Sequence, residues 1–421
     1  MAAVPPPSSD NSEELLLRRK RASAAGGQAK VDALRASGRR TAWERINALV
    51  DEDSFVEVDS FVTHRNDQFN LHLHPIEGDG VVCGHGTVDG RRVFCFAQDF
   101  SVFGGSMGEM HALKIAKLAE MAERARIPLV GIWDGGGQRA HDGVHSLAGT
   151  GVLLDRIVAC SGRIPMFSLI LGPVVGASAL AAGLADFVIL GQEHGQLFLS
   201  SPLETEETAS GEITPHELGG ADLHASRSGI ACMIAADEDD ATEIVSEMLS
   251  FLPDHCLAEP PISKTSDEAN RSCDVLQDLI PDDTNHPYDI RKVILEIVDD
   301  KHFLELSETY ADNIIIGFCR LDGATVGVVA NQPKVLAGCL DIDASIKAAR
   351  FIRTCDCFNI PILTIVDVPG FLPGTVQEWG GIIRHGAKLL YAYAEATVPK
   401  MTVVTRKAYG GAYLAMSCKH L

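Results

Sequence analysis

The sequence contains an internal repeat, and this repeat constrains the fold more than any other feature. Ile127-Pro128 precedes an apolar run that ends at Asp134, and 233 residues later Ile360-Pro361 precedes a similar run that ends at Asp367. Further matched pairs are Gly105 and Gly338, and Lys114 and Lys347, at the same offset, Gly176 and Gly410 at an offset of 234, and Asp51 and Asp299 at an offset of 248. Such an ordered series predicts two copies of one domain, with an extra segment in the first copy near residues 66–80.

Each copy alternates short apolar runs with segments of helical apolar spacing. In the first copy the spacing predicts strands at 93–97, 129–133, 166–171 and 187–190, and helices at 107–126, 144–161 and 177–183. This order is typical of an α/β domain with a parallel sheet and helices packed on it. We therefore expect an α/β fold in each copy.

The domain boundaries follow from the repeat. We place an N-terminal arm at residues 1–40, the first domain at 41–252, a linker at 253–289 and the second domain at 290–421. The linker contains Pro260-Pro261, several acidic residues and weak periodicity. The first copy continues to Leu252 after Ala177, whereas ten residues follow Gly411, so we expect a C-terminally incomplete second domain.

The charge and the cysteines exclude several classes of protein. The net charge of −21 argues against nucleic-acid binding. Residues 1–40 differ, with eight Lys and Arg against four Asp and Glu; this arm is either solvated or contacts a partner. Eleven cysteines without a C-x-x-C pair disfavour a secreted disulfide framework or a zinc ribbon. No apolar signal-peptide segment precedes Asp10, so we expect a cytoplasmic protein, or a mitochondrial-matrix protein if it is eukaryotic.

One uncharged stretch is long enough to span a bilayer. Residues 164–185 carry no charge, but prolines and glycines interrupt them. The counterpart in the second copy, residues 398–407, carries Lys400, Arg406 and Lys407. We therefore predict a buried strand, a turn and a small-residue helix, with no membrane span.

A serine and two pairs of histidines suggest chemistry that the rest of the sequence does not support. Gly104-Gly-Ser-Met-Gly108 matches the G-x-S-x-G pattern of serine hydrolases, but Cys339 replaces Ser106 in the second copy and no base accompanies it. Ser106 and Glu109 also fit a helix capping box, which is the interpretation that we favour. The pairs His141 and His145, and His72 and His74, lack a third ligand, so we expect no metal.

Glycine-rich turns in each copy suggest a different kind of site. Gly176-Ala177 and Gly410-Gly-Ala412 each lie between a predicted strand and a helix, whose N-terminus offers unpaired N–H groups. An earlier strand-end turn adds Gly137 in the first copy and Gly370-Phe371 in the second. Two copies would give two oxyanion holes, with simple tight turns as the alternative.

Several longer motifs resemble a known family over nearly the whole chain, from Leu15 to Leu421. They are Gly104-Gly-Ser-Met-Gly-Glu109, Ser210-Gly-Glu212, Leu218-Gly-Gly-Ala221, Val366-Asp-Val-Pro-Gly-Phe-Leu-Pro-Gly374, Ile383-Arg-His-Gly-Ala-Lys388 and Thr405-Arg-Lys-Ala-Tyr-Gly-Gly-Ala-Tyr413. The chain resembles the carboxyltransferase (beta) subunit of biotin-dependent acyl-CoA carboxylases of the propionyl-CoA carboxylase type.

The resemblance implies a tandem pair of crotonase-like domains. The first would bind acyl-CoA and the second would receive carboxybiotin, with the working site between two protomers of a hexamer that is a trimer of dimers. The implied partners are a biotin carboxylase and a biotin carboxyl carrier, and no metal is implied in this subunit. The implied reaction moves CO2 from carboxybiotin to the α-carbon of a short-chain acyl-CoA such as propionyl-CoA.

The motif match also assigns roles to residues. Gly176, Ala177 and Gly137 would hold the thioester oxygen, while Gly411, Ala412, Gly370 and Phe371 would hold the ureido oxygen of biotin. Because a biotin nitrogen can act as the base, no side-chain acid–base pair is needed. The residues expected to contact substrate or cofactor are Gly136, Arg139, Gly374, Tyr409, Gly410 and Leu414, and the apolar Leu414 indicates an aliphatic acyl group.

Departures from the family pattern fall in the first copy and leave alternatives open. The chain has Asp-Gly-Gly-Gly-Gln-Arg from Asp134 where the family has Asp-Ser-Gly-Gly-Ala-Arg. It also has Gly172-Pro-Val-Val-Gly-Ala-Ser178 for Gly-Pro-Cys-Ala-Gly-Gly-Ala, and Ser200-Ser-Pro202 for Thr-Gly-Pro. The alternatives are a decarboxylase or transcarboxylase subunit that runs the chemistry in reverse, and a non-catalytic homologue within a carboxylase assembly.

Overall fold

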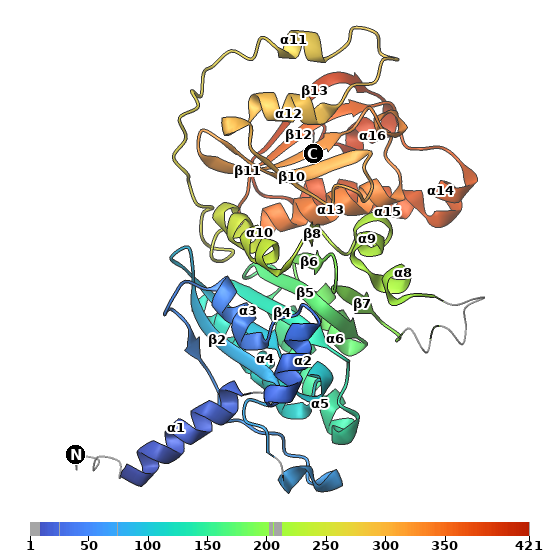
Figure 1. Ribbon diagram of the computed structural model, residues 1–421. Coiled ribbons are helices and arrows are strands. Elements are labelled where there is room, and N and C mark those ends of the chain that lie inside the picture. Colours follow the sequence, from blue (N-terminus) through green and yellow to red (C-terminus); the bar gives the residue numbers. More distant parts are fainter. Residues whose placement is uncertain (1–8, 25, 74, 202–204, 206–212, 421) are drawn as a thin grey trace. The chain divides into compact units, whose positions relative to one another are not determined.

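The computed structural model describes residues 9–24, 26–73, 75–201, 205 and 213–420, and each copy of the repeat forms a sheet of its own (Figure 1). The chain divides into two compact units, which are Met1–Ala221 with Ile234–Ser246, and Asp222–Met233 with Glu247–Leu421. His74, Pro202, the Ser210-Gly-Glu212 motif and Leu421 lie outside the described residues.

The first unit is built on a mixed sheet with parallel central strands. The strand order is β1-β2-β3-β4-β5-β6-β8, and β7 pairs with β5. These strands are β1 (Val56–Glu57), β2 (Val81–Val88), β3 (Arg91–Gln98), β4 (Leu129–Gly135), β5 (Met166–Val175), β6 (Phe187–Gly191), β7 (Gln196–Phe198) and β8 (Met233–Ala235). The strands β3 to β6 run parallel, whereas β2 and β3 form an antiparallel hairpin.

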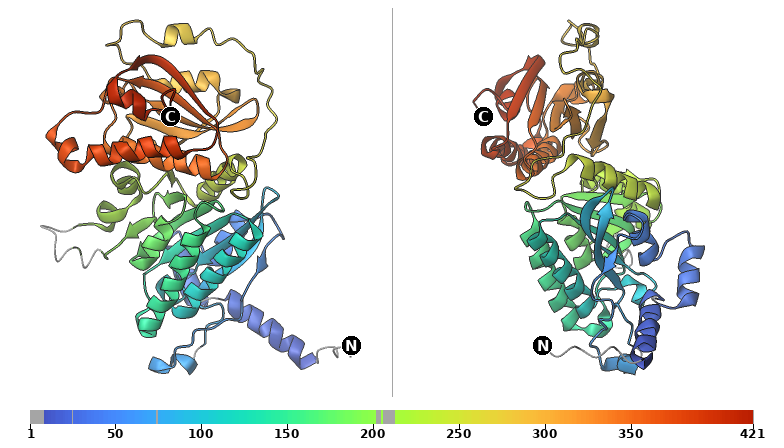
Figure 2. Two further views of the ribbon diagram at one scale, coloured as in Figure 1. Left: turned by 180° about the vertical axis from the view of Figure 1, so that it is seen from behind. Right: turned by 90° about the vertical axis from the view of Figure 1, so that its left-hand side faces the viewer.

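Two long helices lie side by side on one face of this sheet (Figure 2). They are α4 (Glu109–Ala125) and α5 (Val144–Cys160). The other helical segments before the boundary are α1 (Ser9–Ser23), α2 (Gln28–Ala36), α3 (Ala42–Leu49), η1 (Gln68–Leu73), η2 (Phe103–Gly105), η3 (Ala140–Asp142), α6 (Ala177–Gly183) and α8 (Pro215–Gly219). The segments near the unit boundary are α9 (Ala221–Leu223), η4 (His224–Ser228) and α10 (Glu238–Phe251).

The second unit is built on a smaller sheet of the same design. Its strand order is β13-β12-β11-β10-β9, with β11, β12 and β13 parallel and β9, β10 and β11 antiparallel. The strands are β9 (Phe303–Leu306), β10 (Ile314–Leu321), β11 (Ala324–Asn331), β12 (Ile362–Val368) and β13 (Lys400–Ala408). The helical segments are α11 (Leu276–Leu279), α12 (Ile290–Ile297), η5 (Asp299–Lys301), η6 (Leu336–Gly338), α13 (Ile342–Cys357), α14 (Thr375–Gly380), α15 (Ile382–Glu395) and α16 (Gly410–Ala415).

Helices cover both faces of the second sheet. The helices α13 and α15 lie side by side along one face (Figure 1). On the other face Ile290, Val293 and Ile294 of α12 share a buried apolar cluster with strand residues such as Val328 and Ile365. The predicted α/β architecture is therefore confirmed in both copies.

The predicted elements of the first copy are confirmed, with small shifts at their ends. The strands predicted at 129–133 and 166–171 extend to Gly135 and Val175, because buried backbone pairing continues past the apolar runs. The uncharged stretch 164–185 contains β5 and α6, as expected. No helix in the described part of the chain is long and apolar enough to cross a membrane.

Matched hydrogen bonds confirm the duplication at the level of atoms. The carboxylate of Asp51 accepts the N–H groups of Asp89 and Gly90 in the β2–β3 hairpin. Asp299 accepts those of Asp322 and Gly323, at the matching turn of the β10–β11 hairpin. The same buried ammonium recurs on the first long helix of each unit, since Lys114 donates to two backbone carbonyls and Lys347 to four.

The contact between α4 and α5 generates a test with a built-in control. A Cβ added at Gly149 would lie 2.8 Å from the Glu109 carbonyl oxygen, whereas a Cβ at Gly151 would meet no atom within 4 Å. We expect Gly149→Ala to lower the free energy of unfolding by about 1–3 kcal/mol through overpacking. Gly151→Ala should raise it by about 0.5–1 kcal/mol, because alanine loses less backbone entropy in a helix.

Chemical denaturation of both variants measures this difference. Equal effects of the two substitutions would contradict the close packing of α4 on α5.

Candidate functional site

A buried aspartate near the end of one parallel strand anchors the candidate site in each unit. Asp134 of β4 is fully buried, and its carboxylate is ion-paired with Arg39 and with Arg45, whose Nη1 lies 2.6 Å from Oδ2. Asp367 of β12 is equally buried, and the Nε of Arg406 lies 3.0 Å from its Oδ2. Each carboxylate is therefore neutralised inside the protein, as a buried charge requires.

The arginine that neutralises the aspartate comes from different places in the two copies. In the second copy Arg406 belongs to β13 itself. The repeat aligns Arg406 with Gly172 of β5, and a Cβ at Gly172 would lie 2.0 Å from the Asp134 carboxylate and 2.6 Å from Arg39. The glycine thus leaves room for an arginine that the N-terminal segment supplies.

The electrostatics of the first unit follow from this arrangement. Burial alone would lower the pKa of Arg45, but the carboxylates of Asp134 and Glu238 outweigh burial and raise it. The guanidinium therefore stays charged, with Nη2 donating to Glu238 at 2.7 Å and to the Leu171 carbonyl at 3.1 Å. This network fixes the strand that leads into the Gly135-Gly-Gly137 turn.

Backbone contacts hold the glycine-rich turns close to a second loop. The Gly136 N–H donates to the Gly104 carbonyl at 3.0 Å, and the Met107 N–H donates to the Gly137 carbonyl at 2.8 Å. In the second unit the Leu340 N–H donates to the Gly370 carbonyl at 3.1 Å. Gly105 has a φ of +67° and approaches the Asp134 carbonyl so closely that a Cβ would lie 2.1 Å from it, which explains the glycine.

The structure brings the predicted oxyanion residues of the first copy together. A Cβ at Gly137 would lie 3.3 Å from the Val175 carbonyl oxygen, so this turn abuts the strand end that leads into Gly176 and Ala177. Gly176 has a φ of +68°, and its N–H donates to the Phe198 carbonyl at 2.9 Å. The N–H groups of Gly137 and Ala177 donate to no described residue. Gly176 therefore shapes the turn, and Gly137 and Ala177 are the available donors.

The second copy has the same turn in a more open form. Gly410 has a φ of +60°, and the Tyr409 N–H donates to the Val368 carbonyl at 3.1 Å. A Cβ added at Gly370, Gly410 or Gly411 would meet no atom within 4 Å. The repeat aligns Gly176-Ala177 with Gly410-Gly411, so Gly411 is the counterpart of Ala177. Its neighbour Ala412 lies buried in the first turn of α16.

The remaining predicted residues of the second copy lie around this turn. Phe371 pairs with Leu340 in a parallel bridge, and its ring lies against α15, where a Cβ at Gly386 would lie 3.1 Å from it. Gly374 has a φ of +134° at the start of α14. Tyr409 and Leu414 are about half exposed, so their side chains are open to a ligand.

The Arg139 side chain is buried, although the motif match predicts that it contacts substrate or cofactor. Its side chain is 1% exposed, and Nη1 lies 2.5 Å from the Asp79 carboxylate. Its guanidinium also lies over the Phe103 ring and donates to the Ser106 carbonyl. Burial raises the pKa of the Asp79 carboxyl, although Arg139 opposes this change. Arg139 is thus a buried anchor of the 103–108 loop, and its contact with substrate or cofactor stays a prediction.

The predicted capping box at Ser106 and Glu109 is wrong. The Ser106 hydroxyl donates to the Phe103 carbonyl at 2.8 Å, and Gly108 occupies the N-cap position of α4. The carboxylate of Asp142 accepts the Glu109 N–H at 3.1 Å instead. An acidic side chain 33 residues away has taken the place of the local serine, and Ser106 has no base beside it.

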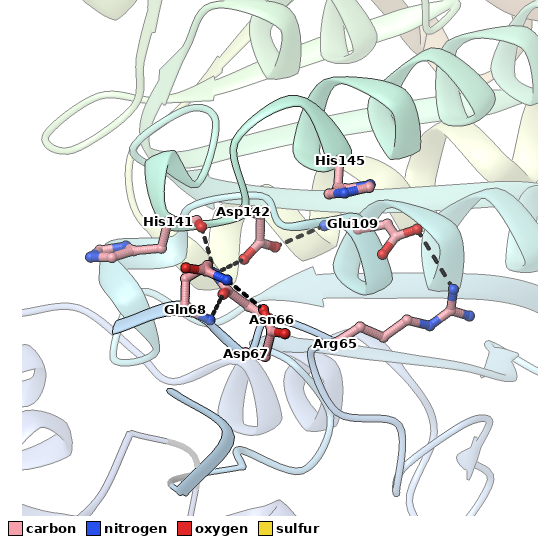
Figure 3. A pocket seen from close by; sticks show the side chains of 8 residues that line it. All are labelled: Arg65, Asn66, Asp67, Gln68, Glu109, His141, Asp142 and His145. Carbon is pink, nitrogen blue, oxygen red and sulfur yellow. Dashed lines mark hydrogen bonds and ion pairs between the residues drawn. The ribbon is translucent and has the colours of Figure 1, made fainter. Parts of the chain in front are cut away.

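The predicted surface histidines border a polar cavity of about 390 Å³ (Figure 3). It is lined by Arg65, Asn66, Asp67, Gln68, Glu109, His141, Asp142 and His145. The Asn66 amide donates to the His141 carbonyl and to the Asp142 carboxylate, so the extra segment of the first copy closes over η3 here. Among the described residues no group of three or more His, Cys, Asp or Glu could hold a metal ion.

Two further site residues carry a signal in the sequence, although neither was predicted. The side-chain oxygen of Gln98 accepts the Asp134 N–H at 3.0 Å, and that of Asn331 accepts the Asp367 N–H at 3.3 Å. These two amides are 233 residues apart, so the repeat itself relates them. The partners Arg39 and Arg45 had no such signal, because the second copy uses Arg406.

A family sequence model and known proteins match this chain over most of its length. The sequence model of the family described as "Carboxyl transferase domain" matches residues 33–421. The chain is 50% identical to the methylmalonyl-CoA decarboxylase subunit alpha of Veillonella parvula, and 48% identical to the propionyl-CoA carboxylase beta chain of Roseobacter denitrificans. Both matches run over 396 residues, which are 94% of this chain and 78% of each relative.

A solved structure shows the same fold. A crystal structure of transcarboxylase 12S with methylmalonyl-coenzyme A and methylmalonic acid bound matches with a TM-score of 0.95 and 43% sequence identity. The match covers 98% of this chain and 81% of that chain, and that protein assembles as a hexamer. The expectation of tandem crotonase-like domains is therefore confirmed.

Neutralisation of Asp367 generates a stability test. Arg406→Leu leaves the buried carboxylate without its cation, so we expect the free energy of unfolding to fall by about 3–5 kcal/mol. Lys301→Ala is the control, because this exposed lysine pairs with Glu296 at the surface. The control should change the free energy of unfolding by less than about 1 kcal/mol.

Denaturant titrations of the two variants provide the comparison. A small effect of Arg406→Leu would show that Asp367 does not depend on this cation.

Proposed function

The chain belongs to the carboxyl transferase domain family as a biotin-dependent acyl-CoA carboxyltransferase, and we propose that its two copies each hold one of the two oxyanions of the reaction. The first copy would hold the thioester oxygen of a short-chain acyl-CoA, and the second would hold the ureido oxygen of carboxybiotin. One observation is the main support for an oxyanion site in each copy. The same turn, with an unpaired N–H at Ala177 or Gly411, recurs at the N-terminus of the helix after β5 and after β13.

The chemistry requires two sites for negative charge. Carboxybiotin on a carrier protein would supply the CO2 and a basic ureido nitrogen. As the α-carbon loses its proton, charge develops on the thioester oxygen, where the N–H groups of Gly137 and Ala177 can donate. The Gly411 N–H can donate to the ureido oxygen in the second copy. Preorganised backbone donors of this kind stabilise such oxyanions without an acid–base side chain.

The second site has room for the biotin ring system. The space beside Gly370, Gly410 and Gly411 is open, because a Cβ added at any of them would meet no atom within 4 Å. Phe371 follows Gly370 directly, and its ring approaches Gly386 closely. Leu414, half exposed on α16, supports a short aliphatic acyl group such as propionyl.

The direction of transfer is the second candidate function. Relatives named propionyl-CoA carboxylase beta chain and methylmalonyl-CoA decarboxylase subunit alpha match this chain about equally well. The same two oxyanion sites would serve carboxylation of an acyl-CoA or the reverse removal of its carboxyl group. We propose carboxylation as the main activity, with decarboxylation or transcarboxylation as the alternative.

We propose a hexamer as the working assembly, with a biotin carboxylase and a biotin carboxyl carrier as partners. The hexamer of transcarboxylase 12S supports this assembly. Each unit also exposes apolar side chains on a helical surface, which an interface would cover. These are Val144, Leu147 and Val158 on α5, and Val376, Trp379 and Ile383 on α14 and α15. The cysteines are all free thiols, which supports a cytoplasmic or mitochondrial-matrix location.

The direction of transfer has a direct test. The full chain is mixed with a biotinylated carrier, biotin carboxylase, ATP, bicarbonate and propionyl-CoA, and we expect carboxylated propionyl-CoA to form. Carboxyl transfer from methylmalonyl-CoA to the carrier without net carboxylation would assign the decarboxylase or transcarboxylase role. Absence of transfer in both directions, with hexamers intact, would favour a non-catalytic homologue.

The donor at Gly411 has a matched pair of variants. Gly411→Pro removes the N–H, and proline is tolerated in the first turn of a helix, so we expect kcat to fall about 100- to 1,000-fold with the fold intact. Gly411→Ala keeps the N–H and adds a Cβ into open space, so it should retain most of the activity. Steady-state rates with carboxylated carrier measure both. Unchanged activity of Gly411→Pro would refute the role of this donor.

A further inference from the structure

A side-chain amide continues the sheet of the first unit beyond the point where backbone pairing ends. The parallel pairing of β3 with β4 ends at Ala97. The next residue of β3, Gln98, accepts the Asp134 N–H through its side-chain oxygen at 3.0 Å. On the other side of β4 the pairing with β5 is irregular at the same point, because its register shifts between Trp133 and Gly135. The Gln98 amide therefore holds the strand end that leads into the glycine turn.

Hydrogen-bond polarity fixes the orientation of this amide. A backbone N–H can only donate, so the Gln98 oxygen faces Asp134 and the NH2 group faces the other way. There Nε2 of Gln98 lies 3.1 Å from Nε2 of His111 on α4, which must therefore accept. The other ring nitrogen, Nδ1, carries the hydrogen and donates to the Asp79 carbonyl at 3.0 Å. All four residues are fully buried, so this chain of hydrogen bonds is shielded from solvent.

The chain of hydrogen bonds requires a neutral imidazole. A proton on Nε2 of His111 would point at the NH2 group of Gln98, and two donors would face each other inside the protein. Burial lowers the pKa of His111 well below its usual value, and the charges of Arg139 and Lys114 lower it further. His111 is therefore held as the neutral tautomer whose Nε2 accepts.

We propose that Gln98 is a positioning residue for the oxyanion donor of the first copy, and that His111 fixes the orientation of its amide. The proposal rests on the proposed function, which gives that donor role to the Gly137 N–H. Gln98 lies against the start of the donor turn, since a Cβ at Gly135 would lie 3.1 Å from its side-chain oxygen. A displacement of about 1 Å near the reacting atoms can slow a reaction about 100-fold. Both side chains act through the backbone of the turn rather than through contact with substrate.

The second copy has the same device without the histidine. Where the β11–β12 pairing ends, Asn331 accepts the Asp367 N–H through its side-chain oxygen. Its Nδ2 donates to the Gly338 carbonyl at 3.3 Å, so a backbone group orients this amide. The repeat aligns His111 with Ala344. His111 therefore acts on the first copy, and its loss should leave the second copy unaffected.

Steady-state kinetics in the full carboxylase assembly test the role of Gln98. Gln98→Met keeps the length of the side chain and removes its hydrogen bonds. We expect kcat to fall about 100-fold, with KM for propionyl-CoA within about 2-fold of the wild type, because the donor acts on the transition state.

Trp133→Phe is the matched control, since it removes a buried hydrogen bond to Ser168 from the residue that precedes Asp134 in β4. This control should lower the unfolding temperature and leave kcat unchanged. If Gln98→Met likewise lowers the unfolding temperature and leaves kcat unchanged, its role is merely structural and the proposal is overturned.

Variants of His111 test the orientation of the amide. His111→Gln offers a side-chain oxygen that can replace Nε2 as acceptor, whereas His111→Met offers no comparable acceptor. We expect His111→Gln to retain most of the activity and His111→Met to lower kcat about 10-fold. The double variant of Gln98→Met and His111→Met should have the kcat of Gln98→Met alone, because His111 acts through Gln98. Equal kcat values of the two His111 variants, or a further loss in the double variant, would overturn the role of His111.

Release of CO2 from carboxylated carrier without acyl-CoA tests whether each amide serves its own copy. Gln98→Met should leave this rate unchanged, and Asn331→Leu should lower it about 100-fold. An equal loss in Gln98→Met would show damage to both copies and overturn a role confined to the first. A wild type that transfers no carboxyl group in either direction contradicts the proposed function. An active wild type with unchanged kcat in Gln98→Met contradicts the positioning role alone.

Discussion

Both sites depend on a buried ion pair, which Asp134 forms in the first unit and Asp367 forms in the second. Each carboxylate is removed from water at the end of a central strand, where a charge is tolerated only when it is paired. The arginines fix the strand end, and the strand end fixes the glycine turn that follows. A backbone N–H can act as an oxyanion donor only if such a turn is held still before the substrate arrives.

The two copies solve this problem in different ways, and the difference fits a division of labour. The second copy is self-contained, because Arg406 on β13 neutralises Asp367 within its own sheet. The first copy has Gly172 at the matching position and takes Arg39 and Arg45 from the N-terminal segment. The first site therefore depends on arginines from outside its own sheet, whereas the second does not. The two copies therefore share one scaffold and differ in the segment that supplies the neutralising arginine.

The sequence predicted the sheet and its helices well and the side-chain contacts poorly. Strands such as 129–133 are uniformly buried runs between prolines and glycines, and the repeat supplied a second, independent instance of each pattern. The capping box failed because Asp142, distant in the sequence, competes for the same N–H. The burial of Arg139 was not predicted, because motif position does not reveal burial and its partner Asp79 lies 60 residues away. Contacts between distant segments leave no local pattern, unless the repeat happens to record both partners, as it does for Gln98 and Asn331.

The proposed oxyanion donors do not depend on the side chains of their own residues. The proposed donors at Gly137, Ala177 and Gly411 are backbone N–H groups, which every residue except proline supplies. Departures from the family pattern in the 134–139 and 172–178 segments therefore leave the proposed donors of the first copy in place. Arg39 and Arg45, in contrast, act through their side chains, because their guanidinium groups neutralise Asp134. The buried ion pairs therefore depend on the identity of side chains, whereas the proposed oxyanion donors depend on the path of the backbone.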